Sequence, residues 1–540
     1  MFMKRVLMVL ALGRWAESAP DADAVPHLPD YGVPPSPMWS GYLDASAAED
    51  GTKLHYWYSQ MENTTTTAGA GSPVVLWLNG GPGSSSILGM LQEMGPVLIN
   101  ATGGLMQNPY AWTKQANLLI LESPAGVGYS YCAAMATGGD CHNTDISTAA
   151  AARAALQDFF GSKFPELATS PLYITGESYA GVYVPTLADE LLRNAPEVAL
   201  KGVAVGDPCT DTPAQEQSMD MLWYAHKHGF VPDADYELLS SDDCDYTARK
   251  PFIARGKWVR GEGNKWEEPA VTATAARKSD ECTLAERKFL LTTSKGISQG
   301  WDGAYINELD LMADAAALDW TLPDTLNYYN AEYMNRDDVK EALHVEAAPV
   351  GAWPGPPSGW TYTSNWNACN DAPGVDSMVQ FYQTIAPQLD TTIVFNGDVD
   401  PCVSYEGTRT AIEEVGFPEV EGGSYRPWFF DKVAASVELL QEKPTLFAPD
   451  VALRDAGAQF GGHVVSYAHN LHFATVHGAG HMVPQFRPMA GARLLSQLLA
   501  NASYPFAPPL PSDDDLLSMS AKDFDATIDS WTDTAKALVE

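Results

Sequence analysis

The sequence predicts an α/β protein with a mostly parallel central sheet, helices on both faces and an inserted, mainly helical cap. Residues 74–78, 117–121 and 202–206 are short continuous apolar runs, which are typical of strands buried on both faces. Helical patterns lie between these runs, and this alternation indicates parallel strands joined by helices. Such runs are missing from residues 211–330, where polar helical patterns take over, so we expect an insertion there.

The size and charge of the chain restrict the class of protein. Its 540 residues suffice for a large domain with an insertion, and 45% hydrophobic residues suffice for a packed core. Lys and Arg number 32 against 68 Asp and Glu, which gives a formal net charge of −36. A surface of that charge repels nucleic acid, so we expect no nucleic-acid partner. The charge is compatible with an acidic compartment, where part of it is neutralised.

The N-terminus has the pattern of a secretory signal peptide. Lys4 and Arg5 precede an apolar run over residues 6–12, which is too short to span a bilayer. A small-x-small cleavage site ends at Ala24, and an earlier cut near Ala19 is the alternative. No later stretch has the length and apolarity of a membrane span. Three sequons for N-glycosylation support secretion: Asn63, Asn100 and Asn501.

Local patterns predict the remaining elements. We expect an antiparallel strand pair at residues 39–43 and 53–58, a hairpin loop at 63–72, a helix over 148–160, and strands at 392–395 and 471–476. The predicted organisation is a signal peptide (1–24), a first part of the core (25–210), the cap (211–330), a second part of the core (331–511) and an acidic C-terminal tail (512–540).

Seven cysteines are compatible with an oxidising compartment and leave one without a disulfide partner. Cys132 and Cys141 lie close together in a Gly-rich segment and are expected to close a local loop. Cys244 and Cys282 bracket a polar, basic stretch and form a second candidate pair. Sequence spacing does not determine the disulfide connectivity of the three remaining cysteines: Cys209, Cys369 and Cys402.

Ser178 is the candidate nucleophile. It lies on a tight turn between a strand at residues 172–175 and a helix over 182–194. A serine so placed forms a nucleophile elbow, a strained turn whose corners admit only small side chains. The residues around Ser178 meet that need: Gly176, Ala180 and Gly181. The N-terminus of the following helix favours negative charge developing at the serine.

A catalytic serine needs a base, usually histidine, and a carboxylate that holds the imidazole in the right tautomer. On this kind of sheet they follow in the order serine, acid, histidine, and the loops after the last two predicted strands carry Asp400 and His481. Asp400 is favoured over Asp398, because Asp398 lies close to a turn glycine and fits the role of a turn cap. His481 is favoured over three nearby histidines, because it lies beyond the strand end and can swing towards Ser178: His469, His472 and His477. The histidines lie along a strand and loop without the spacing of a metal site. We expect no metal and no cofactor.

The oxyanion formed during acyl transfer needs two backbone N–H donors. One is expected from Tyr179, the residue after the nucleophile, and the other from the loop after the strand at residues 74–78. Gly81 in that loop is suited to the second role, because glycine lets the backbone approach a ligand closely.

Taken together, several long motifs resemble the serine carboxypeptidase family of vacuolar, plant and lysosomal enzymes. They cover residues 77–85, 108–112, 122–131, 176–181 and 478–484, and the resemblance extends roughly over residues 39–505. It implies an α/β-hydrolase fold with an inserted cap, and removal of single residues from free C-termini of peptides or proteins at acidic pH.

The resemblance also implies roles for individual residues. Ser178, Asp400 and His481 match the triad, and Gly81 and Tyr179 match the oxyanion amides. A further group matches the binding site for the substrate's terminal carboxylate: Trp77, Asn79, Gly80, Glu93 and Glu177. Because carboxylates repel one another, two glutamates can grip a terminal carboxylate only by sharing protons, so binding is expected to weaken as pH rises.

The sequence departs from the family pattern in three places. Many members have a cysteine where Ser84 stands, bridged to a cysteine near Cys369; without it Cys369 is expected to be unbridged, with Cys209 and Cys402 as an alternative pair. Asp207 replaces the asparagine of the family's Gly-Asn-Pro or Gly-Asn-Gly. Residues 132–141 resemble a small insertion near the substrate cleft, which bears on specificity.

Two alternatives to a peptidase stay open at this point. A carboxypeptidase-like acyltransferase would use the same triad to pass the acyl group to an alcohol, and a protective or scaffold protein would bind partners through the cap. The expected location is the secretory pathway, with secretion or the lysosomal or vacuolar lumen as the destination. A homodimer is a further alternative that the sequence leaves open.

Overall fold

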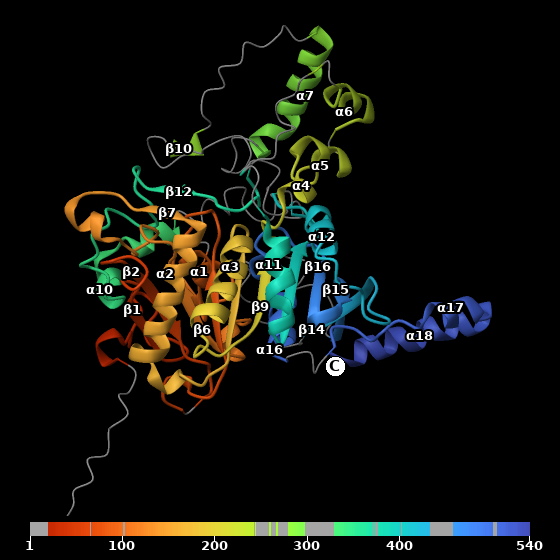
Figure 1. Cartoon of the computed structure of the whole chain (residues 1–540). Coiled ribbons are helices and arrows are strands. Elements are labelled where there is room, and N and C mark those ends of the chain that lie inside the picture. The colour runs from red at the N-terminus through yellow and green to blue at the C-terminus, as the bar shows by residue number, and fades with distance from the viewer. Residues whose placement is uncertain are drawn as a thin grey trace, which may run out of the picture.

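The computed structural model describes residues 20–539, except for residues 65, 101–102, 230, 242–243, 245–258, 261–265, 268–278, 298–328, 371, 373–375, 401, 433–456 and 501–504. Its centre is a 10-stranded sheet in the order β1-β2-β6-β3-β8-β9-β13-β16-β15-β14 (Figure 1). The strands from β6 to β16 in this order run parallel, and antiparallel pairs close both edges. The strands are β1 (Met38–Asp44), β2 (Lys53–Ser59), β3 (Val74–Leu78), β6 (Asn117–Leu121), β8 (Leu172–Glu177), β9 (Leu200–Gly206), β13 (Thr391–Gly397), β14 (Arg426–Lys432), β15 (Gly457–Tyr467) and β16 (Leu471–Val476).

Strand β3 shows why the central strands are apolar throughout. Val74, Leu76 and Leu78 belong to one buried cluster, whereas Val75 and Trp77 belong to another. Successive side chains of a strand point to opposite faces, so the two clusters lie on the two sides of the sheet. Helices α2 (Asp145–Asp158) and α3 (Ala180–Asn194) contribute to the first cluster, and α1 (Ile87–Gln92) and α16 (Pro488–Leu499) contribute to the second. The predicted α/β architecture is therefore confirmed.

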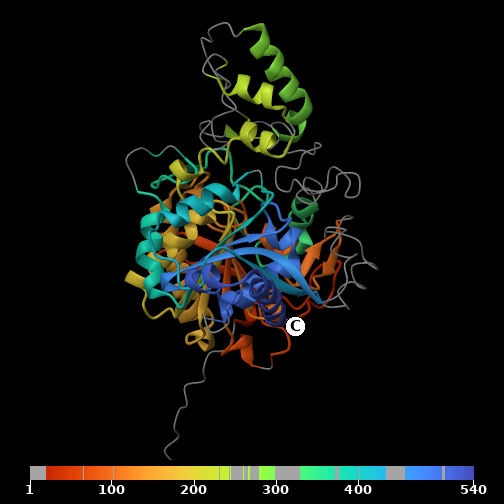
Figure 2. The same cartoon turned by 90° about the vertical axis from the view of Figure 1, so that its right-hand side faces the viewer.

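The described part of the predicted cap is mainly helical. It contains α4 (Thr212–Gln215), α5 (Met221–Lys227), α6 (Asp233–Leu239) and α7 (Asp280–Ile297), together with the short strands β10 (Val259–Arg260) and β11 (Trp266–Glu267). Both views place α5 to α7 above the core (Figures 1 and 2). The Tyr224 hydroxyl on α5 donates to the Val399 carbonyl at 2.8 Å, which fixes the cap at the loop after β13.

One prediction about strands was wrong, and one pair of strands was missed. Residues 63–72 do not form a hairpin loop, because β6 lies between β2 and β3 in the sheet. Turn residues show that a chain leaves the sheet but not beside which strand it returns. The antiparallel edge of β14 and β15 was also missed. These strands contain the adjacent Gly461 and Gly462 and an irregularity between Trp428 and Phe429, which weaken a periodic strand pattern.

Three disulfides join described cysteines. The predicted pairs Cys132–Cys141 and Cys244–Cys282 are confirmed. Cys369 was expected to be unbridged, with Cys209 and Cys402 as an alternative pair, and this prediction was wrong. Cys209 pairs with Cys369, and Cys402 takes no part in these bonds. The two bonded residues are 160 positions apart in the sequence, but their Cα atoms lie 5.2 Å apart. Only the folding of the second half of the core against β9 creates this proximity.

The described N-terminal segment is part of the core. The Asp23 carboxylate is buried, accepts a hydrogen bond from the Tyr56 hydroxyl at 2.7 Å and pairs with Lys163 at 2.5 Å. Cleavage near Ala19 would retain these contacts, whereas cleavage after Ala24 would remove them. Residues 1–19 of the predicted signal peptide and the Asn501 sequon lie outside the described residues.

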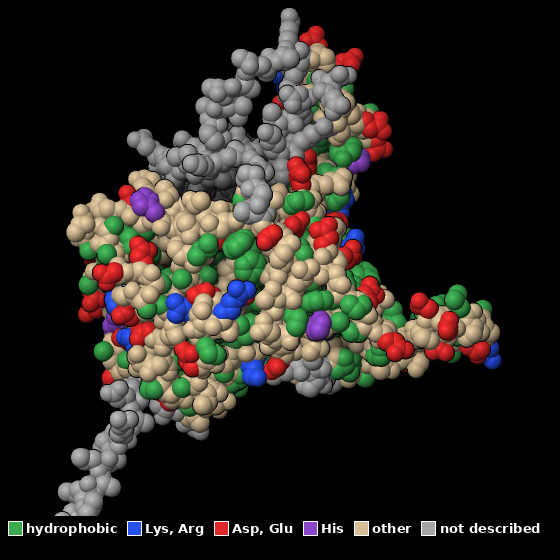
Figure 3. Space-filling model, in the orientation of Figure 1, with side chains coloured by type: hydrophobic (Ala, Val, Ile, Leu, Met, Phe, Trp, Pro, Cys, Tyr) green, Lys and Arg blue, Asp and Glu red, His purple; other side chains and the backbone are tan. Residues whose placement is uncertain are grey.

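The acidic C-terminal tail forms two helices, α17 (Asp513–Ser518) and α18 (Ala521–Ala537), which project from the core (Figure 1). The hydroxyls of Ser512 and Ser520 cap them by accepting from the backbone N–H groups of Asp515 and Asp523. Figure 3 shows many Asp and Glu side chains and fewer Lys and Arg side chains on one face of the molecule. Among the described residues, no helix combines the length and apolarity needed to cross a membrane.

Candidate active site

The turn between β8 and α3 carries Ser178 as an elbow. Ser178 has φ of +63°, a strained value for a residue other than glycine, and its side chain is partly exposed. A Cβ atom at Gly176 would lie 2.4 Å from the Leu78 carbonyl oxygen, and one at Gly181 would lie 2.3 Å from the Cys209 carbonyl oxygen. The small residues around Ser178 are therefore a steric requirement of the turn.

His481 and Asp400 meet at the same edge of the sheet. They follow β16 and β13, which are neighbouring parallel strands, so their C-terminal ends coincide. Nδ1 of His481 lies 2.8 Å from Oδ2 of Asp400. The Asp400 carboxylate is 1% exposed and also accepts from the backbone N–H groups of Cys402 and Val403. The Ser178 hydroxyl makes no hydrogen bond within the described part of the chain, and such contacts often form only when substrate binds.

The neighbouring aspartate and histidines have other partners. Asp398 accepts from the backbone N–H of Gly478 at 2.6 Å and is paired with His477 at 2.9 Å, so it caps the opposite loop. Nδ1 of His472 lies 3.0 Å from the Ser466 hydroxyl, and His469 packs against Phe417. The structure thus brings Asp400, not Asp398, against His481.

The loop after β3 lies against the backbone of the elbow. A Cβ atom at Gly80 would lie 2.3 Å from the backbone nitrogen of Tyr179, and Gly81 has φ of +113°. The backbone of residues 80–81 therefore comes close to the N–H of Tyr179, as two donors of one oxyanion hole require.

Gly80→Ala is expected to lower kcat about 10²- to 10³-fold, because the new methyl group displaces one of the two donors. Gly161→Ala is a matched control, because a Cβ atom there meets nothing within 4 Å and the residue does not have a positive φ. Steady-state kinetics of both variants, with circular dichroism to check folding, make the comparison. Equal kcat values for the wild type and Gly80→Ala would contradict this role of the loop.

A buried pair of glutamates lies beside the elbow. Nδ2 of Asn79 donates to Glu177 at 2.8 Å, while the indole N–H of Trp77 donates to Oδ1 of Asn79 at 2.8 Å. Neither oxygen of Glu93, nor Oε2 of Glu177, has a hydrogen-bond donor among the described groups. Burial raises the pKa of Glu93 to about 8. Burial, and then the charge of Glu93, raise the pKa of Glu177 well above its usual value.

Sequence analysis did not assign a role to two buried aspartates. Asp145 accepts from the hydroxyls of Tyr179 at 3.0 Å and Tyr362 at 2.7 Å, and so fixes an aromatic wall beside the elbow. Asp207 lies behind Asp400: each of Asp207, Asp400 and His481 has one polar atom within 4.8 Å of the others. The one contact of His481 with Asp400 has the length of a hydrogen bond, and we assign no metal there. The sequence signal that could have identified Asp207 was its replacement of the asparagine found in the family pattern.

A second set of serine, histidine and acid is entirely buried. Nε2 of His55 lies 2.9 Å from the Ser40 hydroxyl, and Nδ1 lies 2.8 Å from Glu122. All three residues are 0% exposed, and Glu122 also accepts from the indole N–H of Trp353. No substrate reaches a serine buried in this way, so this set is structural.

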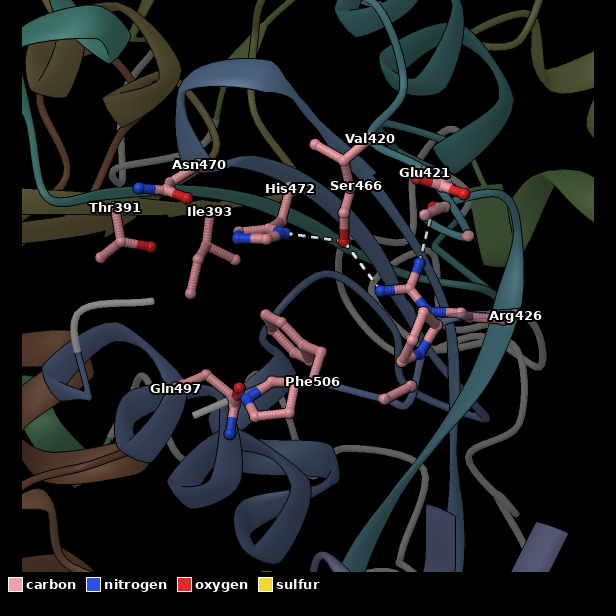
Figure 4. Close-up of a pocket in the computed structure, with 15 residues that line it drawn as sticks. Thr391, Ile393, Val420, Glu421, Arg426, Ser466, Asn470, His472, Gln497 and Phe506 are labelled. Atoms are coloured by element: carbon pink, nitrogen blue, oxygen red, sulfur yellow. Dashed lines mark hydrogen bonds between the residues drawn. The ribbon is translucent and has the colours of Figure 1, made fainter. Parts of the chain in front are cut away.

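A cavity of about 220 Å³ lies at the opposite end of the sheet (Figure 4). It is lined by residues at the starts of β13 and β16, whereas Ser178, Asp400 and His481 follow the ends of their strands. The Arg426 guanidinium in it donates to the carbonyls of Gly423 and Pro508 and to the Ser466 hydroxyl. Burial lowers the pKa of His472 there to about 4, so its imidazole is neutral. These contacts give the cavity walls a structural role.

Comparison with known proteins supports one family. The family model described as serine carboxypeptidase matches residues 28–501. Lysosomal protective protein of Mus musculus is 31% identical over 92% of this chain and 98% of its own, and serine carboxypeptidase 1 of Hordeum vulgare is 28% identical over 90% and 94%.

The structure of Kex1(delta)p, a prohormone-processing carboxypeptidase from Saccharomyces cerevisiae, is similar with a TM-score of 0.58. It is 18% identical and covers 86% of this chain and 92% of its own, so it supports the α/β-hydrolase fold alone. The match of the family model over most of the sequence is the stronger finding. The chain therefore belongs to the serine carboxypeptidase family of hydrolases.

Proposed function

We propose that this protein removes single residues from the free C-termini of peptides or proteins through an acyl-enzyme on Ser178. The observation that carries the proposal is the buried pair of Glu93 and Glu177 with Asn79, next to the elbow. An esterase or a general endopeptidase has no use for such a pair. A site that must hold a substrate carboxylate has a use for it, provided that the pair retains a proton.

The proposed reaction has two steps. The Ser178 oxygen attacks the last peptide carbonyl carbon while His481 takes the hydroxyl proton, and Asp400 stabilises the resulting imidazolium. The N–H groups of Gly81 and Tyr179 donate to the oxyanion. The C–N bond then breaks, and the terminal amino acid leaves with the proton from His481. Water, activated by His481, hydrolyses the ester and frees Ser178.

The pH dependence of binding follows from the shared proton. Below the raised pKa values, Glu93 and Glu177 hold a proton that can be donated to the terminal carboxylate of the substrate. As pH rises through about 8, the value to which burial raises the pKa of Glu93, the pair loses a proton and its negative charge repels that carboxylate. We therefore expect KM for free C-termini to rise with pH, which supports acidic working conditions.

The double variant Glu93→Gln/Glu177→Gln tests this account, because the glutamines keep an acceptor for Asn79 and a donor for the substrate but do not titrate. In the wild type, the preference for a free over an amidated peptide is expected to fall about tenfold for each pH unit above the pKa of the pair. In the variant the preference is expected to stay constant. The measurement is kcat/KM for both peptides against pH. Glu190→Gln, which alters a surface pair with Arg153, is the control and is expected to behave like the wild type. An identical fall in the wild type and in the double variant would contradict the shared proton.

The direct test of function is mass spectrometry of a peptide incubated with the full-length protein at about pH 5 and about pH 8. Stepwise loss of C-terminal residues from the free peptide but not from the amidated peptide, stronger at the lower pH, is the expected result. If neither peptide is cleaved at either pH, the peptidase proposal fails. Consumption of an ester donor with an alcohol acceptor would then identify the acyltransferase alternative.

We further propose that the protein acts in the lumen of the secretory pathway, or of a lysosome or vacuole. Three disulfides require an oxidising route, and a relative named lysosomal protective protein supports the destination. Endoglycosidase treatment of the expressed chain, with glutamine at Asn63, Asn100 and Asn501 in turn, tests transit and the use of each sequon. A chain whose mobility never shifts would contradict glycosylation.

A further inference from the structure

Asp207 is a fully buried carboxyl group directly after β9. It has φ of +45° and is 0% exposed. Its Oδ1 accepts from the backbone N–H of Gly397 at 2.9 Å and from Nδ2 of Asn396 at 3.1 Å. Its Oδ2 is buried and receives no hydrogen bond from any described donor. An ionised oxygen left in this state is costly, whereas a protonated oxygen can itself donate.

The group that faces Asp207 is the Asp400 carboxylate. Three hydrogen bonds already hold Asp400: two from the backbone N–H groups of Cys402 and Val403, and one from Nδ1 of His481. Three donors favour the ionised form of Asp400. Two buried carboxyl groups in contact cannot both be ionised without strong repulsion, so the proton belongs on Asp207.

Two of the three titratable groups that face Asp207 are carboxyl groups, and their negative charge favours its protonated form. Glu177 faces Asp207 from the end of β8, Asp400 from the loop after β13, and His481 from the loop after β16. Burial is the largest cause that raises the pKa of Asp207 well above its usual value, followed by the negative charge of Asp400 and a hydrogen bond with it. The Gly397 N–H acts in the opposite direction, and the charge of Glu177 raises the pKa further.

We propose that Asp207 is a neutral carboxylic acid that donates a hydrogen bond to Asp400 and thereby positions the Asp400–His481 pair for acidic working conditions. Asp207 is a positioning residue, because it acts on the substrate only through Asp400. This inference deepens the proposed function and rests on the assignment of Asp400 and His481 to the triad. When the proton is lost at higher pH, the two carboxylates repel each other and Asp400 turns away from the imidazole.

Two substitutions separate the donated proton from mere filling of space. Asp207→Asn reproduces the neutral acid, because Oδ1 still accepts from Gly397 and Asn396 while Nδ2 donates to Asp400 at every pH. Asp207→Leu has a similar size but neither donates nor accepts. Asp211→Asn is the control, because Asp211 is a nearby helix cap that accepts from the N–H of Ala214 at 2.9 Å.

The experiment measures the rate at which a fluorophosphonate probe phosphonylates Ser178, between about pH 5 and about pH 8. At the acidic end, Asp207→Asn is expected to react within about threefold of the wild type, and Asp207→Leu about tenfold more slowly. Towards the alkaline end, the rate of the wild type is expected to fall relative to that of Asp207→Asn. The Asp211→Asn profile is expected to parallel the wild type.

Parallel profiles of the wild type and Asp207→Asn would overturn the proposal. A phosphonylation rate of the wild type that rises with pH relative to that of Asp207→Asn would overturn it too. A wild type that the probe does not label would overturn it as well, because no working triad would exist. The probe reacts with any activated serine, whichever acyl acceptor the enzyme uses. If peptides are not cleaved but the profiles diverge as expected, the proposed function fails and the role of Asp207 stands.

Unfolding free energy gives a second readout that does not depend on chemistry. The pKa of Asp207 is raised in the folded chain, so over the window between its ordinary and its raised value the folded state binds more protons than the unfolded state. Stability from this group is therefore present below the ordinary value and is lost as pH rises through the window. We expect the denaturant midpoint of the wild type to fall with pH relative to that of Asp207→Asn. A constant difference would contradict a buried proton.

Discussion

Replacing Ser178 with alanine is expected to lower kcat about 10⁶-fold, because the acyl-enzyme can no longer form. KM is expected to change little, since the pair of Glu93 and Glu177 that we propose holds the terminal carboxylate is untouched. The measurement is release of the C-terminal residue at acidic pH, with single-turnover kinetics for the residual rate. Residual activity within about tenfold of the wild type would place the nucleophile elsewhere.

Ser40→Ala provides a matched control within the same chain. Ser40 also belongs to a set of serine, histidine and acid, with His55 at 2.9 Å, but it is 0% exposed. Its loss leaves buried partners unsatisfied, so the free energy of unfolding is expected to fall by about 1–3 kcal/mol. Activity per folded molecule is expected to stay unchanged. The two variants thus separate a hydroxyl that reacts from one that only stabilises the fold.

Asp400→Asn is expected to lower kcat about 10⁴-fold, because the amide N–H would donate to Nδ1 of His481 and fix the wrong tautomer. Nε2 would then carry the proton and could not accept the proton of Ser178. Backbone contacts of the loop are expected to survive, since the amide oxygen can still accept from Cys402 or Val403. The measurement is kcat against pH with an ester substrate, whose binding does not need the terminal carboxylate.

Asp398→Asn is the control for that variant, because the two aspartates lie in one loop and both approach a histidine. Asp398 is 2.9 Å from Nδ1 of His477, in a pair whose histidine side chain is half exposed. An exposed pair contributes little, so we expect kcat to change by less than about threefold. A larger loss for Asp398→Asn than for Asp400→Asn would reverse the assignment of the acid.

The elbow and the central strands were predictable because their signals are local. A tight turn around Ser178 admits only small neighbours, and the sequence around it shows them directly. A strand buried on both faces must be apolar at every position, which marks β3 and β6 without reference to the rest of the chain. The position of His481 after β16 followed from the order of elements along the chain, and the candidate residues for the carboxylate site followed from family resemblance.

Features that depend on neighbours distant in sequence were not predictable in the same way. The pairing of Cys209 with Cys369, the placement of β6 between β2 and β3, and the edge formed by β14 and β15 depend on where the chain returns to the sheet. Local composition does not predict where the chain returns, because several connections are compatible with the same turns and the same apolar pattern.

Local sequence patterns were enough to predict the fold class, the nucleophile turn and a short set of candidate acids and bases. They could not show which carboxyl groups meet in the folded chain: Glu93 with Glu177, and Asp207 with Asp400. The physical reason is that a carboxyl group's pKa depends on the water it loses and on the charges it faces, and both are set by packing. In the sequence, Asp207 is only a departure from the family's asparagine. Because the fold buries it beside Asp400, we infer that it keeps its proton.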